Sequence, residues 1–271
     1  MKRSGFIAST TVGFTRALSH ALMSEEIARQ RGLLQALDAR VRVIGLFALV
    51  VAVTLSRRLA VVLALFVGAA ILAVLSKVSL GTLAKRVWLV VLAFTGVIAL
   101  PAMFVTPGDP IATFAGGLHI TTQGLMTAAL LIARVETAVT FTTVLILCTP
   151  WAHVLKALHS FRLPREVTTM LAMTHRYVFL LVETASQMFE SRHSRTVGRL
   201  PRAEQRRMVA RSAGVLLSKS IDLGNDVYLA MQARGFRGEV RILSDFSMKP
   251  RDYAGLLAFL CAGTLAIWMG R

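Results

Sequence analysis

Acidic residues and cysteines are both scarce in this sequence of 271 residues. Only 14 Asp and Glu stand against 31 Lys and Arg, so the formal net charge is +17. The two cysteines, Cys148 and Cys261, lie far apart in apolar stretches. This arrangement supports neither a disulfide framework nor a thiolate metal site, and we interpret both cysteines as small packing residues.

Short signatures of catalysis and nucleotide binding are missing as well. The sequence contains no Gly-x-x-x-x-Gly-Lys-Ser/Thr loop, no nucleophile elbow and no paired-carboxylate pattern. No two of its histidines fall at i, i+4 with a carboxylate between them, and no cluster has metal-ligand spacing. We therefore expect a protein that is not an enzyme and has no catalytic residue, metal site or cofactor of its own.

Apolar residues, in contrast, are abundant and gathered in blocks. They make up 55% of the chain, and the mean hydropathy is +0.63. A helix that spans a bilayer needs about 17 to 25 predominantly apolar residues. We expect an all-α fold, a polytopic helical bundle in a lipid bilayer. The expected spans are 43–55, 59–75, 87–106, 123–149 and 253–269.

The distribution of basic residues predicts the orientation of these spans. No Lys or Arg lies between Arg86 and Arg134, whereas residues 151–251 hold more than half of all basic residues. Because Lys and Arg near span ends are retained in the cytoplasm, we expect 107–121 to be an outer loop and 151–251 to be cytoplasmic. Five crossings then leave the N-terminus inside and Arg271 outside.

The first two expected spans are short. Ser56-Arg57-Arg58 between them either forms a tight outer turn or interrupts one long buried helix. We favour the turn, because short helices can pack inside a bundle. This choice puts two arginines on the outer side, against the charge rule.

The predicted organisation has four parts. Residues near the start of the chain are of mixed polarity and lack the short apolar run of a cleavable signal peptide. The parts are a cytoplasmic N-terminal segment (1–36), a transmembrane region with four spans (37–150), cytoplasmic helices (151–251) and a C-terminal transmembrane helix (252–271).

Two long helices are expected within the cytoplasmic part. Residues 165–197 contain no Gly or Pro and follow Pro164, a residue that favours helix starts. At a rise of 1.5 Å per residue this helix would be about 50 Å long. The second helix covers 202–234, where apolar residues recur at three- and four-residue steps. The first helix ends near Arg195 and the second at Arg234, so both have basic tips.

The second helix ends in Ala233-Arg234-Gly235. Ordinary capping explains this sequence, because Gly235 can adopt the left-handed conformation after a helix and Arg234 suits the negative end of the helix dipole. However, two long helices within one loop that both end in basic residues favour a shared target for the two tips.

At this point the chain resembles the T component of energy-coupling factor (ECF) transporters, and most closely the cobalt and nickel subfamily, CbiQ. In that family the cytoplasmic coupling helices end in Ala-Arg-Gly motifs whose Arg docks into a groove of an ATP-binding-cassette (ABC) ATPase. The resemblance covers roughly residues 37–242. It also rests on Leu37-Asp38-Ala39-Arg40-Val41-Arg42, Thr149-Pro150, Leu163-Pro164 and His175-Arg176-Tyr177.

The resemblance implies a multi-pass coupling subunit in the cell inner membrane, part of an ATP-driven importer for cobalt or nickel. ABC-type ATPase subunits would bind the ATP, and a separate substrate-binding membrane subunit, the S subunit, would bind the ion. A T component of a vitamin importer is the alternative. The resemblance implies ATPase docking by Ala233, Arg234 and Gly235, and by Ser194, Arg195 and Thr196, where the small neighbours of the family motif are replaced.

Arg134 and Glu136 are charged residues inside a long apolar segment. Such charges are costly in a bilayer and usually face the protein interior. We expect them to form an intramembrane ion pair or to meet partners in another span; a place on a transport pathway is the alternative.

Two other classes of protein were weighed. A secondary transporter should show inverted repeats and broken helices, and no internal repeat is present. A nucleic-acid-binding membrane anchor would suit the net charge, but zinc-finger spacing and aromatic RNA-binding motifs are lacking. We therefore expect no nucleic-acid partner.

Overall fold

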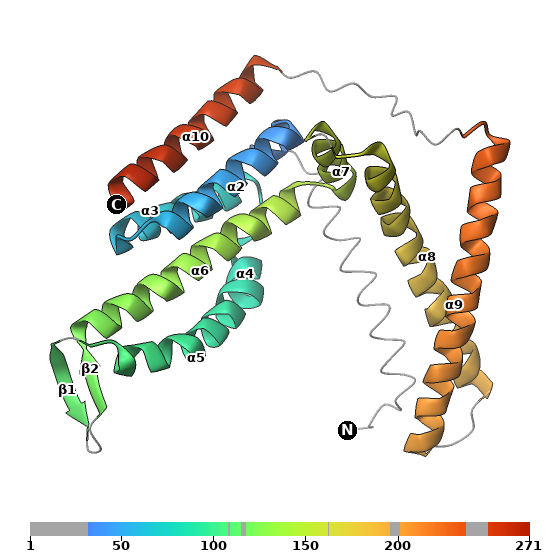
Figure 1. Cartoon of the computed structure of the whole chain (residues 1–271), viewed down its shortest axis with the longest axis horizontal. Helices are drawn as coiled ribbons and strands as arrows, with labels where there is room; N and C mark the ends of the chain where they lie inside the picture. The colour runs from blue at the N-terminus through green and yellow to red at the C-terminus, as the bar shows by residue number, and fades with distance from the viewer. Residues whose placement is uncertain (1–31, 108, 115–117, 162, 196–200, 237–248) are drawn as a thin grey trace. The chain divides into compact units, whose positions relative to one another are not determined.

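The computed structural model describes residues 32–107, 109–114, 118–161, 163–195, 201–236 and 249–271. The chain forms two compact units. Residues 158–245 contain two long helices, and residues 25–157 together with 246–271 contain the bundle of apolar helices. Figure 1 shows that helices dominate, which confirms the predicted fold class.

Helices occupy all five expected spans. Two of these helices in the described part of the chain, α6 and α10, are long and apolar enough to span a membrane. Helix α3 and the first part of α5 are apolar but shorter. The number of membrane crossings therefore stays a prediction. The helices are α2 (Ala39–Leu55), α3 (Leu59–Leu75), α5 (Leu89–Val105), α6 (Thr122–Cys148) and α10 (Pro250–Gly270).

The expected turn between the first two spans is present. Helix α2 begins after Asp38, whose side chain accepts a hydrogen bond from the N–H of Arg40, and ends at Ser56, whose backbone is extended. The N–H of Leu33, just before a short 3₁₀ turn, η1 (Leu34–Ala36), donates to the carbonyl of Leu75. Helix α3 thus returns to the end at which α2 starts.

Helix α5 is preceded by a segment that the sequence did not predict. A short helix, α4 (Leu80–Leu83), continues into a π-helical stretch, η2 (Ala84–Trp88), and then into α5. Trp88 in this stretch donates from Nε1 to Oγ1 of Thr140 in α6 at 3.0 Å. This hydrogen bond ties the start of α5 to the second half of α6.

A small β-sheet lies in the loop between α5 and α6. Strands β1 (Pro110–Phe114) and β2 (Leu118–Thr121) are antiparallel. At the base of this hairpin, Thr121 donates from Oγ1 to the carbonyl of Thr106 and caps α6 by accepting from the N–H of Gly124. A Cβ atom on Gly124 would lie 2.6 Å from the carbonyl oxygen of Met103, so glycine permits the close approach of α5 and α6 here.

The bundle helices alternate in direction. The N–H of Arg57 donates to the carbonyl of Gly270 at 2.8 Å, so α10 ends beside the turn between α2 and α3. Figure 1 shows α2 and α10 parallel to one another and α6 antiparallel to both. One end of the bundle therefore gathers the starts of α2 and α10 with the end of α6. These relative directions agree with those expected of the first, fourth and fifth spans, while the side of the membrane at which this end lies stays a prediction.

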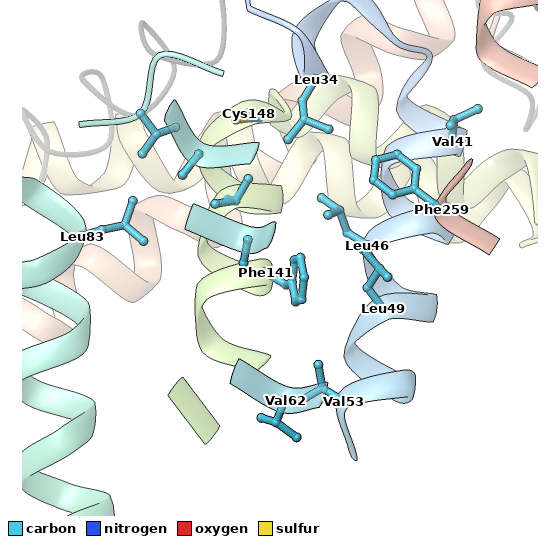
Figure 2. Close-up of a cluster of buried hydrophobic side chains, with 14 residues drawn as sticks. Leu34, Val41, Leu46, Leu49, Val53, Val62, Leu83, Phe141, Cys148 and Phe259 are labelled. Atoms are coloured by element: carbon cyan, nitrogen blue, oxygen red, sulfur yellow. The ribbon is translucent and has the colours of Figure 1, made fainter. Parts of the chain in front are cut away.

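The core of the bundle is formed by side chains from these helices (Figure 2). Phe141 of α6 is 1% exposed and lies among residues of α2 and α3, while Phe259 of α10 packs on α2. Many large apolar side chains instead face outward, for example Trp268, which is 79% exposed. Exposed apolar surface of this extent suits contact with lipid or with another membrane subunit. The α2 and α3 members of the core include Leu46, Leu49, Val53 and Val62.

The second unit is a pair of long helices. Helix α8 (Arg165–Arg195) has 31 residues and α9 (Arg202–Ala233) has 32. They contact each other and run in opposite directions (Figure 1). A shorter helix, α7 (Trp151–Ser160), precedes them and crosses the boundary between the units. The predicted ranges of the two long helices agree with the observed ones where the residues are described.

Candidate coupling site

The end of α9 is a complete Schellman cap. The N–H of Gly235 donates to the carbonyl of Gln232 at 2.9 Å, and the N–H of Phe236 donates to the carbonyl of Met231 at 3.0 Å. Gly235 has φ +81°, in the left-handed region. These are the two hydrogen bonds that define this cap, so the capping interpretation of Gly235 is confirmed.

The cap does not account for the side chain of Arg234. This residue contributes only its backbone N–H, which donates to the carbonyls of Ala230 and Met231. Its side chain is exposed, and no partner for its guanidinium is found among the described residues. Ala233 and Gly235 on either side are exposed too. The motif thus presents one long cationic side chain between two small residues.

A second helix in the protein shows that the cap requires neither Arg nor Gly. Helix α3 ends in the same pattern of hydrogen bonds. The N–H of Lys77 donates to the carbonyl of Val74, and the N–H of Val78 donates to the carbonyl of Ala73. There the left-handed position, with φ 58°, is occupied by Lys77. Helix termination alone therefore favours Gly235 but leaves Ala233 and Arg234 unexplained.

The tip of α8 differs in detail from that of α9. Ser194 donates from Oγ to the carbonyl of Glu190 at 3.0 Å, so its hydroxyl is engaged by its own helix. Arg195 is the last residue of α8 and is exposed, with no side-chain partner in the described part of the chain. Thr196, which sequence reasoning included in this site, lies outside the described residues. Of Ser194 and Arg195, Arg195 is therefore the residue whose side chain is not engaged within the described part of the chain.

The two tips are not neighbours. Because α8 and α9 are antiparallel, Arg195 and Arg234 lie at opposite ends of the pair (Figure 1). The 32 residues of α9 correspond to about 48 Å. A single compact groove cannot hold both side chains, so a shared target must offer two binding sites.

The expected ion pair between Arg134 and Glu136 is not formed. Residues two apart on a helix point about 200° away from each other. Arg134 instead donates from Nη2 to the carbonyl of Ser56 at 2.8 Å, so its partner lies in another segment, at the end of α2. Glu136 is 7% exposed, and both its carboxylate oxygens lack a hydrogen-bond partner among the described residues.

Sequence reasoning missed the role of the basic residue Arg42. This side chain is 3% exposed, at the start of α2, and donates from Nη1 to the carbonyl of Cys148 and to Oγ1 of Thr149. The Leu37–Arg42 and Thr149-Pro150 segments were singled out by resemblance alone, and the structure joins them. A basic residue next to an apolar run was the available signal, but nothing local indicated its partner 106 residues away.

The described residues contain no group of three or more His, Cys, Asp or Glu side chains that could hold a metal ion.

Comparison with known proteins gives the family. The CbiQ cobalt transport protein family matches residues 30–243, which include α2 to α9 with both tips. The chain belongs to the CbiQ family. Its relatives named CbiQ and EcfT place it among the transmembrane components of ECF-type transporters, so it is a membrane protein and a transporter component.

Three relatives illustrate the breadth of this similarity. An uncharacterized protein of Methanocaldococcus jannaschii is 33% identical over 94% of this chain and 88% of its own length. The cobalt transport protein CbiQ of Rhodobacter capsulatus is 30% identical over 63% of this chain and 70% of its own length. The ECF transporter transmembrane protein EcfT of Leuconostoc gelidum subsp. gasicomitatum is 29% identical over 58% of this chain and 65% of its own length.

Proposed function

We propose that this chain is the transmembrane coupling subunit of an ATP-driven ECF importer for cobalt or nickel. ABC-type ATPase subunits hydrolyse ATP, an S subunit binds the ion, and this chain transmits force between them. Membership of the CbiQ family and the similarity to a cobalt transport protein support the proposal. In this scheme the chain has no catalytic residue and needs no cofactor.

The observation that carries the proposal is the placement of two exposed arginines at the opposite ends of the α8–α9 pair. Each helix is a rigid rod of more than 30 residues, and each ends in a guanidinium with no side-chain partner in the described part of the chain. Two tips at opposite ends of a helix pair in which α9 alone is about 48 Å long suit two ATPase subunits, one at each tip. Closure of the ATPases around ATP then displaces the tips relative to each other.

The chemistry of each tip fits a polar groove. A guanidinium can donate several hydrogen bonds in a planar fork to carboxylates and carbonyls. At α9 the Schellman cap fixes the backbone around Arg234, and no atom lies within 4 Å of a Cβ built on Gly235. The motif can therefore enter a narrow groove with its backbone close to the wall.

The bundle crosses the cell inner membrane with the starts of α2 and α10 at the cytoplasmic face. Residues 151–251, which are rich in Lys and Arg, connect to that end, as the charge rule requires. The N-terminus is then cytoplasmic and Arg271 lies outside. Arg57 and Arg58 are exposed at the outer end and are exceptions to the rule.

Copurification tests the proposal. The chain, expressed with the genes of its own importer, should bring down an ABC-type ATPase and a second membrane subunit, and metal analysis of the complex should detect cobalt or nickel. A vitamin in the complex instead of a metal would favour the alternative, a vitamin importer. Isolation of the chain without an ATPase would contradict the coupling role. ATPase retention that does not fall steeply with salt would exclude binding through nucleic acid.

A further inference from the structure

Two connections join the two units of the chain, and both meet the bundle at the same end. The first leaves α6 through Thr149-Pro150 and continues into α7 and α8, and the second returns from α9 through Lys249 to α10. Movement of the long helices can therefore reach the bundle along these connections. Two side chains bind these connections to the start of α2, Arg42 for the first and Asp252 for the second.

Arg42 holds the first connection. The last carbonyls of a helix lack partners within the helix, and Pro150 has no N–H to offer them. Arg42 supplies the donor from α2, through Nη1, to the carbonyl of Cys148, with Oγ1 of Thr149 at 3.4 Å. A cation is also favoured at the negative end of a helix dipole. The end of α6 is thus fastened to the first turn of α2.

Asp252 holds the second connection. Its carboxylate is 4% exposed, and its two oxygens accept from different segments. Oδ2 accepts from the N–H of Lys249 at 2.9 Å, which caps α10, and Oδ1 accepts from the N–H of Asp38 at 2.9 Å. The carboxylate of Asp252 therefore caps α10 and also links this helix to Asp38, the residue that caps α2.

The two fastenings lie within one helical turn, residues 38–42. Asp38 and Asp252 both interact electrostatically with the guanidinium of Arg42, so the three groups form one cluster, in which Arg42 and Asp252 are buried and Asp38 is half-buried. Close packing extends this cluster along the helices. A Cβ on Gly45 would lie 2.5 Å from the Phe259 ring, and one on Gly255 would lie 3.0 Å from Leu37. Helices α2 and α10 thus have little room to move independently.

We infer that the first turn of α2 is the joint at which movement of the long helices enters the transmembrane bundle, with Arg42 and Asp252 as positioning residues. A displacement of either connection acts on residues 38–42 and through them on the other connection. This inference rests on the proposed coupling function and adds the residues that transmit the movement.

The test measures metal uptake per ATP hydrolysed by the complete importer in proteoliposomes. Arg42→Gln and Asp252→Asn should leave ATPase retention within about twofold of wild type and lower uptake per ATP at least about fivefold. Arg42→Lys should lie between wild type and Arg42→Gln, because a single ammonium keeps the charge without the guanidinium geometry. Arg251→Gln, at an exposed neighbour of Asp252, is the matched control and should behave as wild type.

A purely structural role predicts a different result. The amount of folded complex and the uptake would then fall in proportion, and uptake per ATP would be unchanged in every variant, which would overturn the inference. If Arg42→Gln does not fold, Arg42→Lys and Asp252→Asn decide by the same ratio. A wild-type complex without ATP-dependent uptake would overturn the proposed function and the joint together, whereas a normal wild type with unchanged ratios in the variants overturns only the joint.

Discussion

The backbone N–H of Asp38 donates to Oδ1 of Asp252 across 2.9 Å, although 214 residues separate them in the sequence. This hydrogen bond joins the start of the first bundle helix to the start of the last one. All of the long α8–α9 segment lies between them along the chain. The segment that is proposed to bind the ATPases therefore leaves the bundle and returns to it between two helices that are themselves hydrogen-bonded to each other.

Charge reversal at Arg234 should weaken ATPase binding. If the groove buries an acidic partner, loss of the arginine leaves that charge unpaired, at a cost of about 3 to 5 kcal/mol, which corresponds to two or more orders of magnitude in affinity. Arg234→Glu adds repulsion, and Arg234→Lys should restore binding only in part. The measurement is ATPase retention on the immobilised membrane subunit. Arg206→Glu and Arg207→Glu, at exposed positions of α9, should retain the ATPase, and equal losses in these controls would show that total charge is what matters.

Variants of Gly235 should separate two roles of this residue, the capping of α9 and the close approach to an ATPase groove. Gly235→Ala places a side chain at φ +81°, which should cost roughly 1 to 2 kcal/mol, and Gly235→Asn should cost less because Asn tolerates this conformation better. No further clash is expected in the isolated chain, since beyond the neighbouring residues no atom lies within 4 Å of the added Cβ. If the wall of the ATPase groove lies close to Gly235, ATPase retention should fall even in a variant whose thermal stability is nearly that of wild type. Equal effects of Asn and Ala on retention, with stability unchanged by Asn, would indicate that the groove rejects any side chain.

Arg134 and Glu136 should act independently on stability. Arg134→Met removes the donor to the carbonyl of Ser56 and should lower the free energy of unfolding by about 1 to 3 kcal/mol. Glu136→Gln keeps the shape of a side chain without a hydrogen-bond partner among the described residues, so it should change stability by less than about 1 kcal/mol. The double variant, measured by unfolding in detergent, should be additive within about 0.5 kcal/mol. A large coupling energy would restore the ion-pair interpretation.

Cysteine labelling tests the orientation. In a background in which Cys148 and Cys261 are replaced, cysteines at Thr122 and at Ser218 should react with a membrane-impermeant reagent from opposite sides. Both positions are exposed, and they lie at the outer end of α6 and on α9 in the proposed topology. Only the Thr122 position should label in intact cells, and labelling of both from outside would refute the proposed orientation.

Much of the bundle could be predicted from the sequence because bilayer-spanning helices need long apolar runs, and such runs are local features. The helices found at Leu59–Leu75 and Thr122–Cys148 agree closely with the expected ranges, 59–75 and 123–149. The turn at Ser56 was predicted as the better of two alternatives. The π-helical stretch Ala84–Trp88 and the β-hairpin were not predicted, because each depends on contacts with α6 or with the opposite strand.

The charged residues within the bundle show where local reasoning ends. Arg134 and Glu136 were expected to form an ion pair or to meet partners in another span. Helix geometry separates the two side chains, and the partner of Arg134 is a backbone carbonyl in another segment. Arg42 likewise binds the carbonyl of Cys148. Backbone carbonyls are present at every residue, so no sequence pattern identifies the one that a distant arginine will reach.

The basic tips could be found from the sequence, since helix ends and their residues are local, but their separation could not. Arg195 and Arg234 were expected to share a target, and the antiparallel arrangement of α8 and α9 puts them at opposite ends. This separation is the reason for proposing two docking sites. The assignment of the tips to ATPase docking stays a proposal.

The most direct test of the coupling role is the double variant Arg195→Glu, Arg234→Glu. ATPase retention on the immobilised membrane subunit and ATP-dependent metal uptake in cells should both be lost, while each single variant should keep one docking site and retain the ATPase more weakly than wild type. Arg206→Glu combined with Arg207→Glu makes the same change of charge at exposed positions and should leave both properties intact. Wild-type retention and uptake in the Arg195→Glu, Arg234→Glu variant would contradict the proposal that these tips couple the ATPases to the membrane subunit.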